Sequence, residues 1–384
     1  MNILIVSRTP THPLNAGNRW GILAQVQILR QYGNDVHFLY VEHRRIKRSL
    51  QSEYNNDLIQ TQKYWGKDFY HFKVSMIQRL WMSLVYHWRW VINGGELHVD
   101  DQYPVGLTSY VRNICKKTKY DILIVNYFSL SKLIKKTNFP KSAIFTHDCY
   151  AYRKMAVKEN CFYLNAHSEA IAMQRAKHLF AVQSNEASYF SIISPNSLVY
   201  TVYSKYDYHH QPITGNKNIC YLASDNNYNV NGIIWFIHEI LPGIRSRHKD
   251  AFLIIGGKVC DKLPNNVEKN GCKLFGYVES PEAFYSQADV AINPVSQGTG
   301  LKIKTFEALS YDKVTMVHPH SISGIFHRDS APLFSSENPS EWADFLDEIW
   351  SNNGIIEKIK KQNELYLASM NKFVDGEYRR FLAF

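Results

Sequence analysis

The stretch 289–309 reads DVAINPVSQGTGLKIKTFEAL and contains the three parts of a strand–turn–helix unit. Residues 290–294 form a short run typical of a buried strand, two glycines allow a tight turn, and a helical pattern follows over 302–310. A helix that begins just after a strand directs its free amides and the positive end of its dipole towards the turn. The stretch therefore predicts an α/β fold with an anion site at the end of a strand.

Three side chains of this stretch suit a nucleotide. Lys302 brings a positive charge to the start of the predicted helix, and Lys304 follows two residues later. Glu307, about one and a half turns into the helix, can accept hydrogen bonds from the two hydroxyls of a ribose. The stretch thus predicts a site for a diphosphate and its ribose.

Strands and helices alternate on both sides of this stretch. In the second half we expect strands at 218–223, 251–256, 273–275, 290–294 and 313–318, with helices at 230–241, 280–287 and 302–310. In the first half we expect strands at 3–6, 35–41, 121–126, 142–146 and 178–183, with helices at 19–32, 129–137 and 168–176. This pattern predicts two doubly wound, Rossmann-like domains, joined near 204–216, that face a central crevice where ligands bind.

Residues 43–100 do not fit the alternation. They begin with a basic run that contains Arg44, Arg45, Lys47 and Arg48, and an aromatic-rich segment follows. Trp81, Leu84, Val85 and Trp88 are spaced to share one face of a helix. Two interpretations stay open: an interfacial helix on the acceptor or membrane side, with a basic polar face that includes Arg79 and Arg89, or a core helix of an α-helical insertion in the N-terminal domain.

Charge is distributed unevenly along the 384 residues. The net charge is +10, but residues 1–210 carry 26 basic and 14 acidic residues, whereas the remainder carries 18 and 20. A basic first half favours an anionic partner, which can be a nucleic acid, a membrane surface or a phosphorylated substrate. No RNP aromatic motif, KH loop or zinc finger is recognisable, so we expect no nucleic-acid partner.

The sequence also restricts which cellular compartment and which metal sites we expect. Six cysteines include no CxxC pair, which argues against a zinc framework, and no Asp-x-Asp motif is present. The N-terminus lacks the basic and apolar regions of a signal peptide, and no apolar run is long enough to span a membrane. We therefore expect a cytoplasmic protein, with peripheral attachment to the inner face of the cytoplasmic membrane as a further possibility.

The stretch 289–309 resembles the donor-binding signature of family 4 glycosyltransferases with the GT-B fold. Segments 235–242, 254–257 and 275–278 fall in the order that this family shows. The resemblance implies two Rossmann-like domains, 1–208 for the acceptor and 217–367 for the nucleotide-sugar, with 368–384 packing back on the first. It also implies retaining, metal-independent transfer from a UDP- or GDP-sugar, without a cofactor, to a hydroxyl of a glycan or lipid-linked glycan. The type resembled makes bacterial surface polysaccharide, such as lipopolysaccharide.

The resemblance also assigns roles to residues. The donor diphosphate would be held by Gly17, Gly298, Thr299, Gly300, Leu301, Lys302 and Lys304. Glu307 matches the glutamate that binds ribose, and the nucleotide base would lie by Lys258, Tyr277 and Val278.

Two positions depart from the family pattern. Thr299 stands where the family has a glutamate that contacts the donor sugar, and 224–229 lacks the usual basic pair. Ser224 and Asn229 could bind phosphate by hydrogen bonding instead. Thr299 also favours an alternative function, a catalytically silent scaffold or sensor that binds sugar nucleotides.

A further group of candidates follows the strand expected at 142–146. His147 matches a family histidine that contacts the donor sugar, and its imidazole could donate to a sugar oxygen. The alternative is a histidine packed at the end of a strand. Asp148 could orient His147 or serve as the acceptor base. Arg153 either binds an acceptor phosphate or, as we favour, pairs with a carboxylate.

Overall fold

The structure is a computed structural model that describes residues 1–14, 16–42, 51–92, 94, 98–101, 103–156, 164–264 and 266–383, without the side chains of 154–156. The chain divides into two compact units, which are described separately. Unit 1 comprises Met1–Ser204 with Val374–Phe384, and unit 2 comprises Lys205–Phe373. None of the described helices combines the length and the apolar character needed to cross a bilayer.

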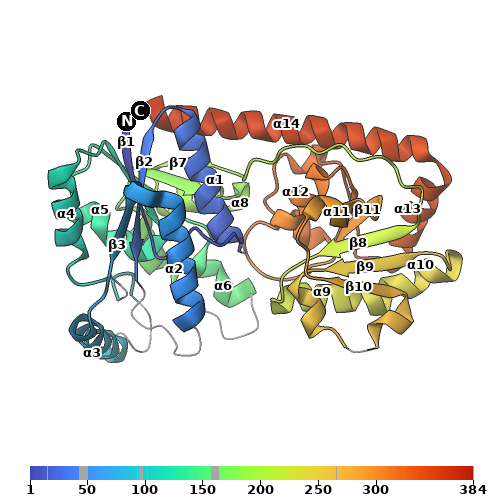
Figure 1. Cartoon of the computed structure of the whole chain (residues 1–384), viewed down its shortest axis with the longest axis horizontal. Helices are drawn as coiled ribbons and strands as arrows, with labels where there is room; N and C mark the ends of the chain where they lie inside the picture. Colours follow the sequence, from blue (N-terminus) through green and yellow to red (C-terminus); the bar gives the residue numbers. More distant parts are fainter. Residues whose placement is uncertain are drawn as a thin grey trace. The chain divides into compact units, whose positions relative to one another are not determined.

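Unit 1 is built on a parallel sheet of seven strands (Figure 1). In chain order, the strands are β1 (Asn2–Ser7), β2 (Asp35–Val41), β3 (Phe69–Phe72), β4 (Ile122–Asn126), β5 (Lys141–Phe145), β6 (His178–Ala181) and β7 (Leu198–Thr201). Their order across the sheet is β3-β2-β1-β4-β5-β6-β7. The chain therefore reverses its direction of winding between β1 and β4, and the loops after these two strands diverge at the point where such sheets bind ligands.

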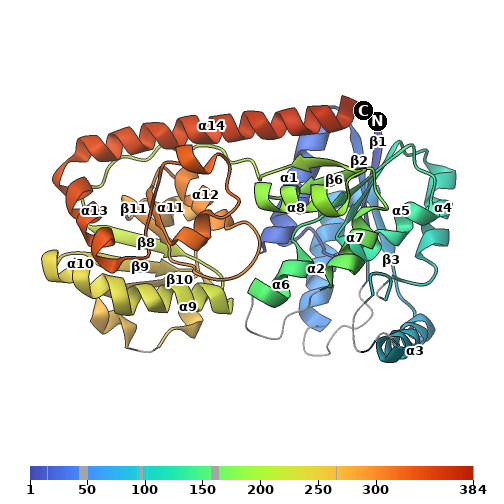
Figure 2. The same ribbon diagram turned by 180° about the vertical axis from the view of Figure 1, so that it is seen from behind.

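Helices cover both faces of this sheet, with α1 and α2 nearer the viewer in Figure 1 and α7 and α8 nearer in Figure 2. In chain order, the helices are α1 (Gly17–Gln31), α2 (Gln51–Trp65), α3 (Met76–Ile92), α4 (Leu107–Lys117), α5 (Lys132–Lys136), α6 (Tyr150–Ala156), α7 (Ala166–Met173) and α8 (Ser184–Ile193). Because both faces are covered, the central strands are largely apolar: all five residues of β4 are buried, and all but Asn126 at its end are apolar.

The region 43–100 contains more regular structure than the sequence indicates. Residues 69–72, which we placed outside the alternation, form β3, and β3 pairs in parallel with β2. Helix α2 is thus the crossover of an ordinary βαβ unit. The aromatic residues of 69–72 suit a strand as well as a helix, which is why this pattern was misleading. Among the described elements of this region, α3 is the one that neither belongs to the sheet nor connects two neighbouring strands of it.

Unit 2 has a second parallel sheet, of six strands. In chain order, the strands are β8 (Asn218–Leu222), β9 (Phe252–Gly256), β10 (Cys272–Gly276), β11 (Val290–Asn293), β12 (Val314–Val317) and β13 (Leu333–Ser335). The main helices are α9 (Asn227–Trp235), α10 (Leu241–Arg247), α11 (Pro281–Tyr285), α12 (Ile303–Ser310) and α13 (Pro339–Ser351). The order across the sheet is β10-β9-β8-β11-β12-β13, so the reversal here lies between β8 and β11. The two sheets confirm the predicted pair of Rossmann-like domains.

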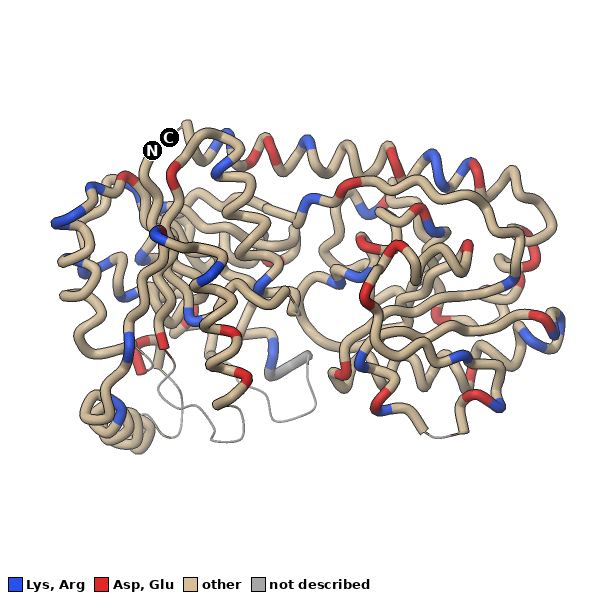
Figure 3. The backbone as a smooth tube through the Cα atoms, viewed as in Figure 1, with Lys and Arg blue, Asp and Glu red and all other residues tan. Residues whose placement is uncertain are grey.

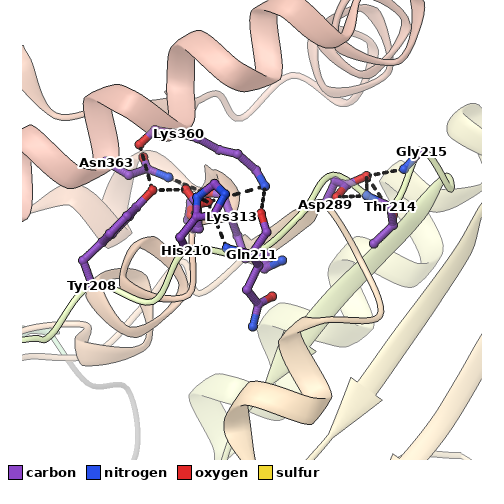
Figure 4. Close-up of polar contacts among 11 residues, drawn as sticks. Tyr208, His210, Gln211, Thr214, Gly215, Asp289, Lys313, Lys360 and Asn363 are labelled. Atoms are coloured by element: carbon purple, nitrogen blue, oxygen red, sulfur yellow. Dashed lines mark hydrogen bonds and ion pairs between the residues drawn. The ribbon is translucent and has the colours of Figure 1, made fainter.

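The segment expected to be a linker, 204–216, is bound tightly to unit 2 from residue 205 on (Figure 4). The fully buried carboxylate of Asp312 accepts hydrogen bonds from the Tyr208 hydroxyl (2.6 Å) and the Gln211 amide (3.3 Å). Asp289 accepts from the amide (2.9 Å) and the hydroxyl (2.8 Å) of Thr214. Two buried acids therefore make this segment part of the unit 2 core.

The last helix, α14 (Asn353–Ala383), belongs to unit 2 up to Phe373 and to unit 1 from Val374. Within unit 1, the buried rings of Tyr378 and Phe381 pack against Phe180, with ring centroids 5.4 and 4.8 Å apart. Glu377 accepts a hydrogen bond from the amide of Thr201 (2.9 Å).

Candidate active site

The glycine turn predicted to bind phosphate lies after β11, at the reversal point of the unit 2 sheet. Gly298 and Gly300 have φ angles of 97° and 76°, a region that glycine adopts without strain. A Cβ atom on Gly298 would lie 3.2 Å from the ring of Tyr228, in the first turn of α9. The turn after β11 therefore packs against the helix that follows the neighbouring strand β8.

Three side chains hold this turn by its carbonyl groups. Lys302 donates from Nζ to the carbonyls of Thr299 and Gly300, both at 3.2 Å. His320, after β12, donates from Nε2 to the carbonyl of Gly298 (2.8 Å), and Ser321 donates to that of Val295 (2.8 Å). With the carbonyls engaged, the amides of Gly300 and Leu301 donate no hydrogen bond to any residue that the structure describes. Successive amides without an acceptor, in a turn with left-handed glycines, are typical of an anion-binding nest.

Helix α12 begins at Ile303, slightly later than predicted, and Lys302 is its N-cap residue. Lys302 therefore fastens the turn in addition to bringing a charge to the helix start. Leu301 and Thr299 are half-buried beside it. Sequence reasoning found Lys302 from its position but missed His320 and Ser321, because nothing near either residue in the sequence signals a contact with the glycine turn.

Ser224, Asn229 and Lys304 form one connected group. Asn226 caps α9 by accepting from the amide of Asn229 (2.9 Å). The side-chain amide of Asn229 donates to the carbonyl (3.0 Å) and the hydroxyl (3.1 Å) of Ser224, and its oxygen accepts from Nζ of Lys304. Asn229 is buried, so in this arrangement it positions Lys304 and its amide group is already engaged.

Lys304 and Glu307 both have strongly shifted pKa values. Burial, with help from the charge of Lys302, lowers the pKa of Lys304 to about 7, and Glu307 acts against this shift. Burial raises the pKa of Glu307 to about 7, against the opposing effect of Lys304. Among the described residues, no side chain donates a hydrogen bond to the Glu307 carboxylate. This carboxylate is half-buried and able to accept hydrogen bonds from a ligand.

The residues predicted near the base lie at the same edge of the sheet. Lys258 directly follows Gly257 at the end of β9 and is exposed, and Tyr277, just after β10, is 83% exposed. Val278 is half-buried, and a Cβ on Gly256 would lie 2.8 Å from it. The parallel order β10-β9-β8-β11 places these residues at the strand ends that also lead into the glycine turn.

In unit 1, His147 directly follows the Thr146 that ends the predicted strand and has a φ of 63°. Its ring stacks on Tyr127, with centroids 4.3 Å apart, and its Nε2 donates to the side-chain oxygen of Asn126 (2.6 Å). Burial lowers the pKa of His147 to about 3, so the ring is neutral. In this tautomer Nδ1 can only accept, whereas the sequence led us to expect donation to a sugar oxygen.

Asp148 and Arg153 pair with each other. Arg153 donates from Nε (2.9 Å) and Nη2 (2.6 Å) to Oδ2 of Asp148, whose Oδ1 accepts from the amide of Cys149 (2.8 Å). This confirms the interpretation of Arg153 as the partner of a carboxylate. The carboxylate of Asp148 points to Arg153 and its own turn, with no hydrogen bond to His147 among the described contacts.

Glu169 is a positioning residue that the sequence did not reveal. It is fully buried on α7, and its carboxylate accepts from the amides of Tyr150 (2.8 Å) and Ala151 (2.9 Å) at the start of α6. Burial raises its pKa. Glu169 therefore holds the turn that carries His147 and Asp148.

The first loop of unit 1 lies beside this turn. Gly17 is exposed at the start of α1, and Asn18 donates to the hydroxyl of Tyr127 (3.0 Å). Arg44, Arg45, Lys47 and Arg48 lie outside the described residues. Within the part of the chain that the structure describes, no group of three or more His, Cys, Asp or Glu side chains is placed to hold a metal ion.

Comparisons with known proteins bear on the fold and on the C-terminal domain. Residues 216–352 match the family model for glycosyl transferases group 1. A Klebsiella pneumoniae protein, described as an uncharacterized 44.6 kDa protein in the cps region, is 21% identical over 335 residues, which cover 80% of each chain.

Two solved structures are similar over the whole chain. TarM, known from S. aureus, has a TM-score of 0.68 at 9% identity and covers 100% of this chain and 98% of its own. Anabaena HepE, solved with UDP, has a TM-score of 0.65 at 10% identity and covers 100% of both chains. The fold is thus that of the GT-B glycosyltransferases, and residues 216–352 resemble a group 1 glycosyl transferase domain.

Proposed function

We propose that this chain transfers a sugar from a UDP- or GDP-linked donor to a hydroxyl of a glycan or lipid-linked glycan during synthesis of a bacterial surface polysaccharide. The observation that best supports this proposal is the glycine turn after β11. Its carbonyls accept hydrogen bonds from side chains of the protein, whereas the amides of Gly300 and Leu301 have no acceptor within the described residues. HepE is known with UDP and with UDP-glucose, and the Klebsiella relative comes from a cps region. These relatives support the class of donor and of product.

The reaction would break the bond between the anomeric carbon and the β-phosphate oxygen of the donor. The acceptor oxygen forms the new glycosidic bond, and its proton passes to the leaving phosphate. The growing negative charge on the diphosphate is stabilised by amides fixed before the reaction and by Lys302 and Lys304, which is effective because these groups need no reorganisation. We propose retention of configuration and independence from a metal, on the resemblance to family 4.

Two residues are proposed to orient the donor. Glu307 would accept from the ribose hydroxyls, since its carboxylate has acceptor positions to spare. His147 would accept from a hydroxyl of the donor sugar through Nδ1, because Nε2 already donates to Asn126. We further propose a cytoplasmic location, with peripheral attachment to the inner face of the membrane.

A nucleotide-binding experiment tests the donor site. UDP, GDP and CMP are titrated against the wild-type chain and the Lys302→Ala and Glu307→Ala variants, with stability as the measure of binding. Loss of a hydrogen bond to a charged group corresponds to roughly 10- to 100-fold weaker binding. The exposed Lys358→Ala and Glu348→Ala variants are the controls. Unchanged nucleotide affinity in both site variants would contradict the proposal.

The alternative function is a catalytically silent scaffold, which Thr299 favours. A turnover measurement distinguishes it from a transferase. Donor consumption is measured with and without a glycan acceptor. Tight nucleotide binding without any consumption of donor would contradict the transferase function and support the scaffold function.

A further inference from the structure

Helix α3 is apolar on the side that faces solvent. Eight of its side chains are between 58% and 80% exposed: Met76, Ile77, Leu80, Trp81, Leu84, Trp88, Val91 and Ile92. At 100° per residue these positions cover an arc of about 160° of the helix. That arc contains no Asp, Glu, Lys or Arg, and His87 is its one ionisable member. A continuous exposed surface of this kind marks an interaction site.

The charged side chains of α3 face the protein instead. Arg79 pairs with Glu42 (2.7 Å), and Arg89 pairs with Asp101 (3.4 Å). Met82, on the same side, is 4% exposed. Both interpretations of the sequence therefore need correction: the face with Trp81 and Trp88 is outside the core, and the arginines attach the helix to unit 1. These ion pairs fix the helix with its apolar arc outward.

Exposed cations lie on the same side of unit 1 as α3. They belong to α4, α5 and the residue pair after α4: Arg112, Lys116, Lys117, Lys119, Lys135 and Lys136. Arg112 donates to the carbonyl of Lys136 (2.8 Å), which joins α4 to α5. Gln78 of α3 donates to the carbonyl of Val105 (3.0 Å), next to the start of α4. Both views place α3, α4 and α5 on one side of the sheet (Figures 1 and 2).

These six residues, which we call the α4–α5 cations, face no acid. None of them forms an ion pair with a residue that the structure describes, and α3, α4 and α5 contain no Asp or Glu (Figure 3). An apolar arc with tryptophan, next to unpaired cations, is complementary to the interface of an anionic bilayer. There, indole rings lie at the level of the headgroups and lysines attract acidic lipids.

We infer that α3 binds the surface of an anionic lipid bilayer, with its apolar arc in the interfacial zone and the α4–α5 cations towards acidic headgroups. The ion pairs of Arg79 and Arg89 keep one side of α3 on the protein, so the helix lies along the bilayer surface. A second copy of this chain is the less favoured occupant, because paired α4–α5 cations would repel each other. This inference deepens the peripheral attachment proposed above, but lipid binding needs neither donor nor acceptor.

The apolar arm of the test compares vesicle binding by two double variants. Leu84→Gln/Trp88→Gln removes two members of the arc, and Ile192→Gln/Leu365→Gln removes two exposed apolar side chains elsewhere. Vesicles of phosphatidylcholine, with and without phosphatidylglycerol, are used in a flotation assay. We expect wild-type binding to require phosphatidylglycerol. Transfer of one such side chain from water is worth about tenfold in affinity, so the arc variant should bind about 100-fold more weakly and the control should not change.

The charge arm replaces four lysines. Lys116, Lys117, Lys135 and Lys136 are changed to Ser, and the control changes the exposed Lys262, Lys269, Lys358 and Lys361 of unit 2. Each lysine near an anionic surface contributes about fivefold in affinity, so the first variant should lose binding and most of its salt dependence. Equal losses in both variants would refute the role of the α4–α5 cations.

Three results would overturn the inference. The first is vesicle binding that the Leu84→Gln/Trp88→Gln variant retains. The second is wild-type protein that does not bind vesicles containing phosphatidylglycerol. The third is self-association without lipid, lost in the same variant, which would make a second copy the occupant. Vesicle binding by a chain without transferase activity would leave the inference intact and sink only the proposed reaction.

Discussion

Replacement of Glu307 by Gln should make the ligand-free protein more stable at alkaline pH, although it removes a proposed ligand of the ribose. Glu307 lies half-buried on α12, and no described side chain donates to its carboxylate. Burial therefore penalises the ionised form, which is why the pKa of Glu307 rises to about 7. Gln has nearly the same shape and carries no charge.

The pKa shift sets both the size and the pH range of the effect. A carboxyl with a pKa of 4.5 in the unfolded chain and about 7 in the folded one binds more protons when folded. Its contribution to stability is present below the unfolded value and is lost as pH rises through 7. Each pKa unit corresponds to about 1.4 kcal/mol, giving an upper value of about 3 kcal/mol at pH 8.5. Because Glu307 is partly exposed to screening solvent, we expect about 1–2 kcal/mol.

Thermal unfolding at two pH values measures this effect. At pH 8.5, Glu307→Gln should raise the melting temperature by about 3–6 °C. At pH 5.5, where Glu307 is protonated in the folded state but largely ionised in the unfolded chain, the gain should be roughly half as large or less. Added UDP should stabilise the variant less than the wild type. A gain of the same size at both pH values, or a loss at pH 8.5, would refute the reasoning.

The neighbouring lysine provides a control of opposite sign. Burial lowers the pKa of Lys304 from 10.5 to about 7, so its contribution to stability is lost as pH falls from about 10.5 to about 7, and the cost stays constant below that. Any stabilisation from Lys304→Met should therefore be larger at pH 5.5 than at pH 8.5. The two variants together separate the effect of each group from a general effect of pH on unfolding.

Three further predictions concern residues outside this pair. Asp312→Ala should lower the free energy of unfolding by about 3–5 kcal/mol in urea titrations, because buried Lys360, 3.5 Å from Asp312, loses its partner; Asp312→Asn should lose less. Gly298→Ala should cost about 1–3 kcal/mol and weaken UDP binding, whereas Gly243→Ala, a helical glycine with open space around it, should not destabilise. His147→Ala should reduce kcat about 10- to 100-fold with unchanged UDP affinity, and the wild-type pH–rate profile should show no His147 titration above pH 5.

The sequence predicted the local geometry of the strand–turn–helix unit well. The glycines, Lys302 and Glu307 lie within ten consecutive residues, and the geometry of a strand–turn–helix unit determines where each one points. The contacts that hold them come from far along the chain. Asn229 lies 75 residues from Lys304, and His320 lies 22 residues from Gly298. A single sequence carries no signal for such pairs, so the hydrogen-bonded role of Asn229 was not foreseen.

The same limit applies to α3. Its period predicted a helix with Trp81 and Trp88 on one face, but period alone does not say which face is buried. That is decided by Glu42 and Asp101, which bind Arg79 and Arg89 from outside the helix. In the sequence, a pair of arginines in an apolar helix predicts that their side of the helix faces solvent. In the structure these arginines attach α3 to unit 1 through ion pairs, and the apolar side of the helix is exposed.

The turns after β11 and after β5 both require a left-handed backbone conformation, and different residues adopt it in the two units. Both follow a strand at or beside the reversal of its sheet, and both need φ angles in the left-handed region. Unit 2 uses glycine there, which avoids strain and brings amides close to a ligand. Unit 1 uses His147, and a non-glycine residue in this region persists only where its surroundings hold it, here Asn126 and the turn capped by Glu169. Since glycine or asparagine at position 147 would relieve the strain, stability alone does not account for a histidine. This favours a role for its ring in contact with the substrate.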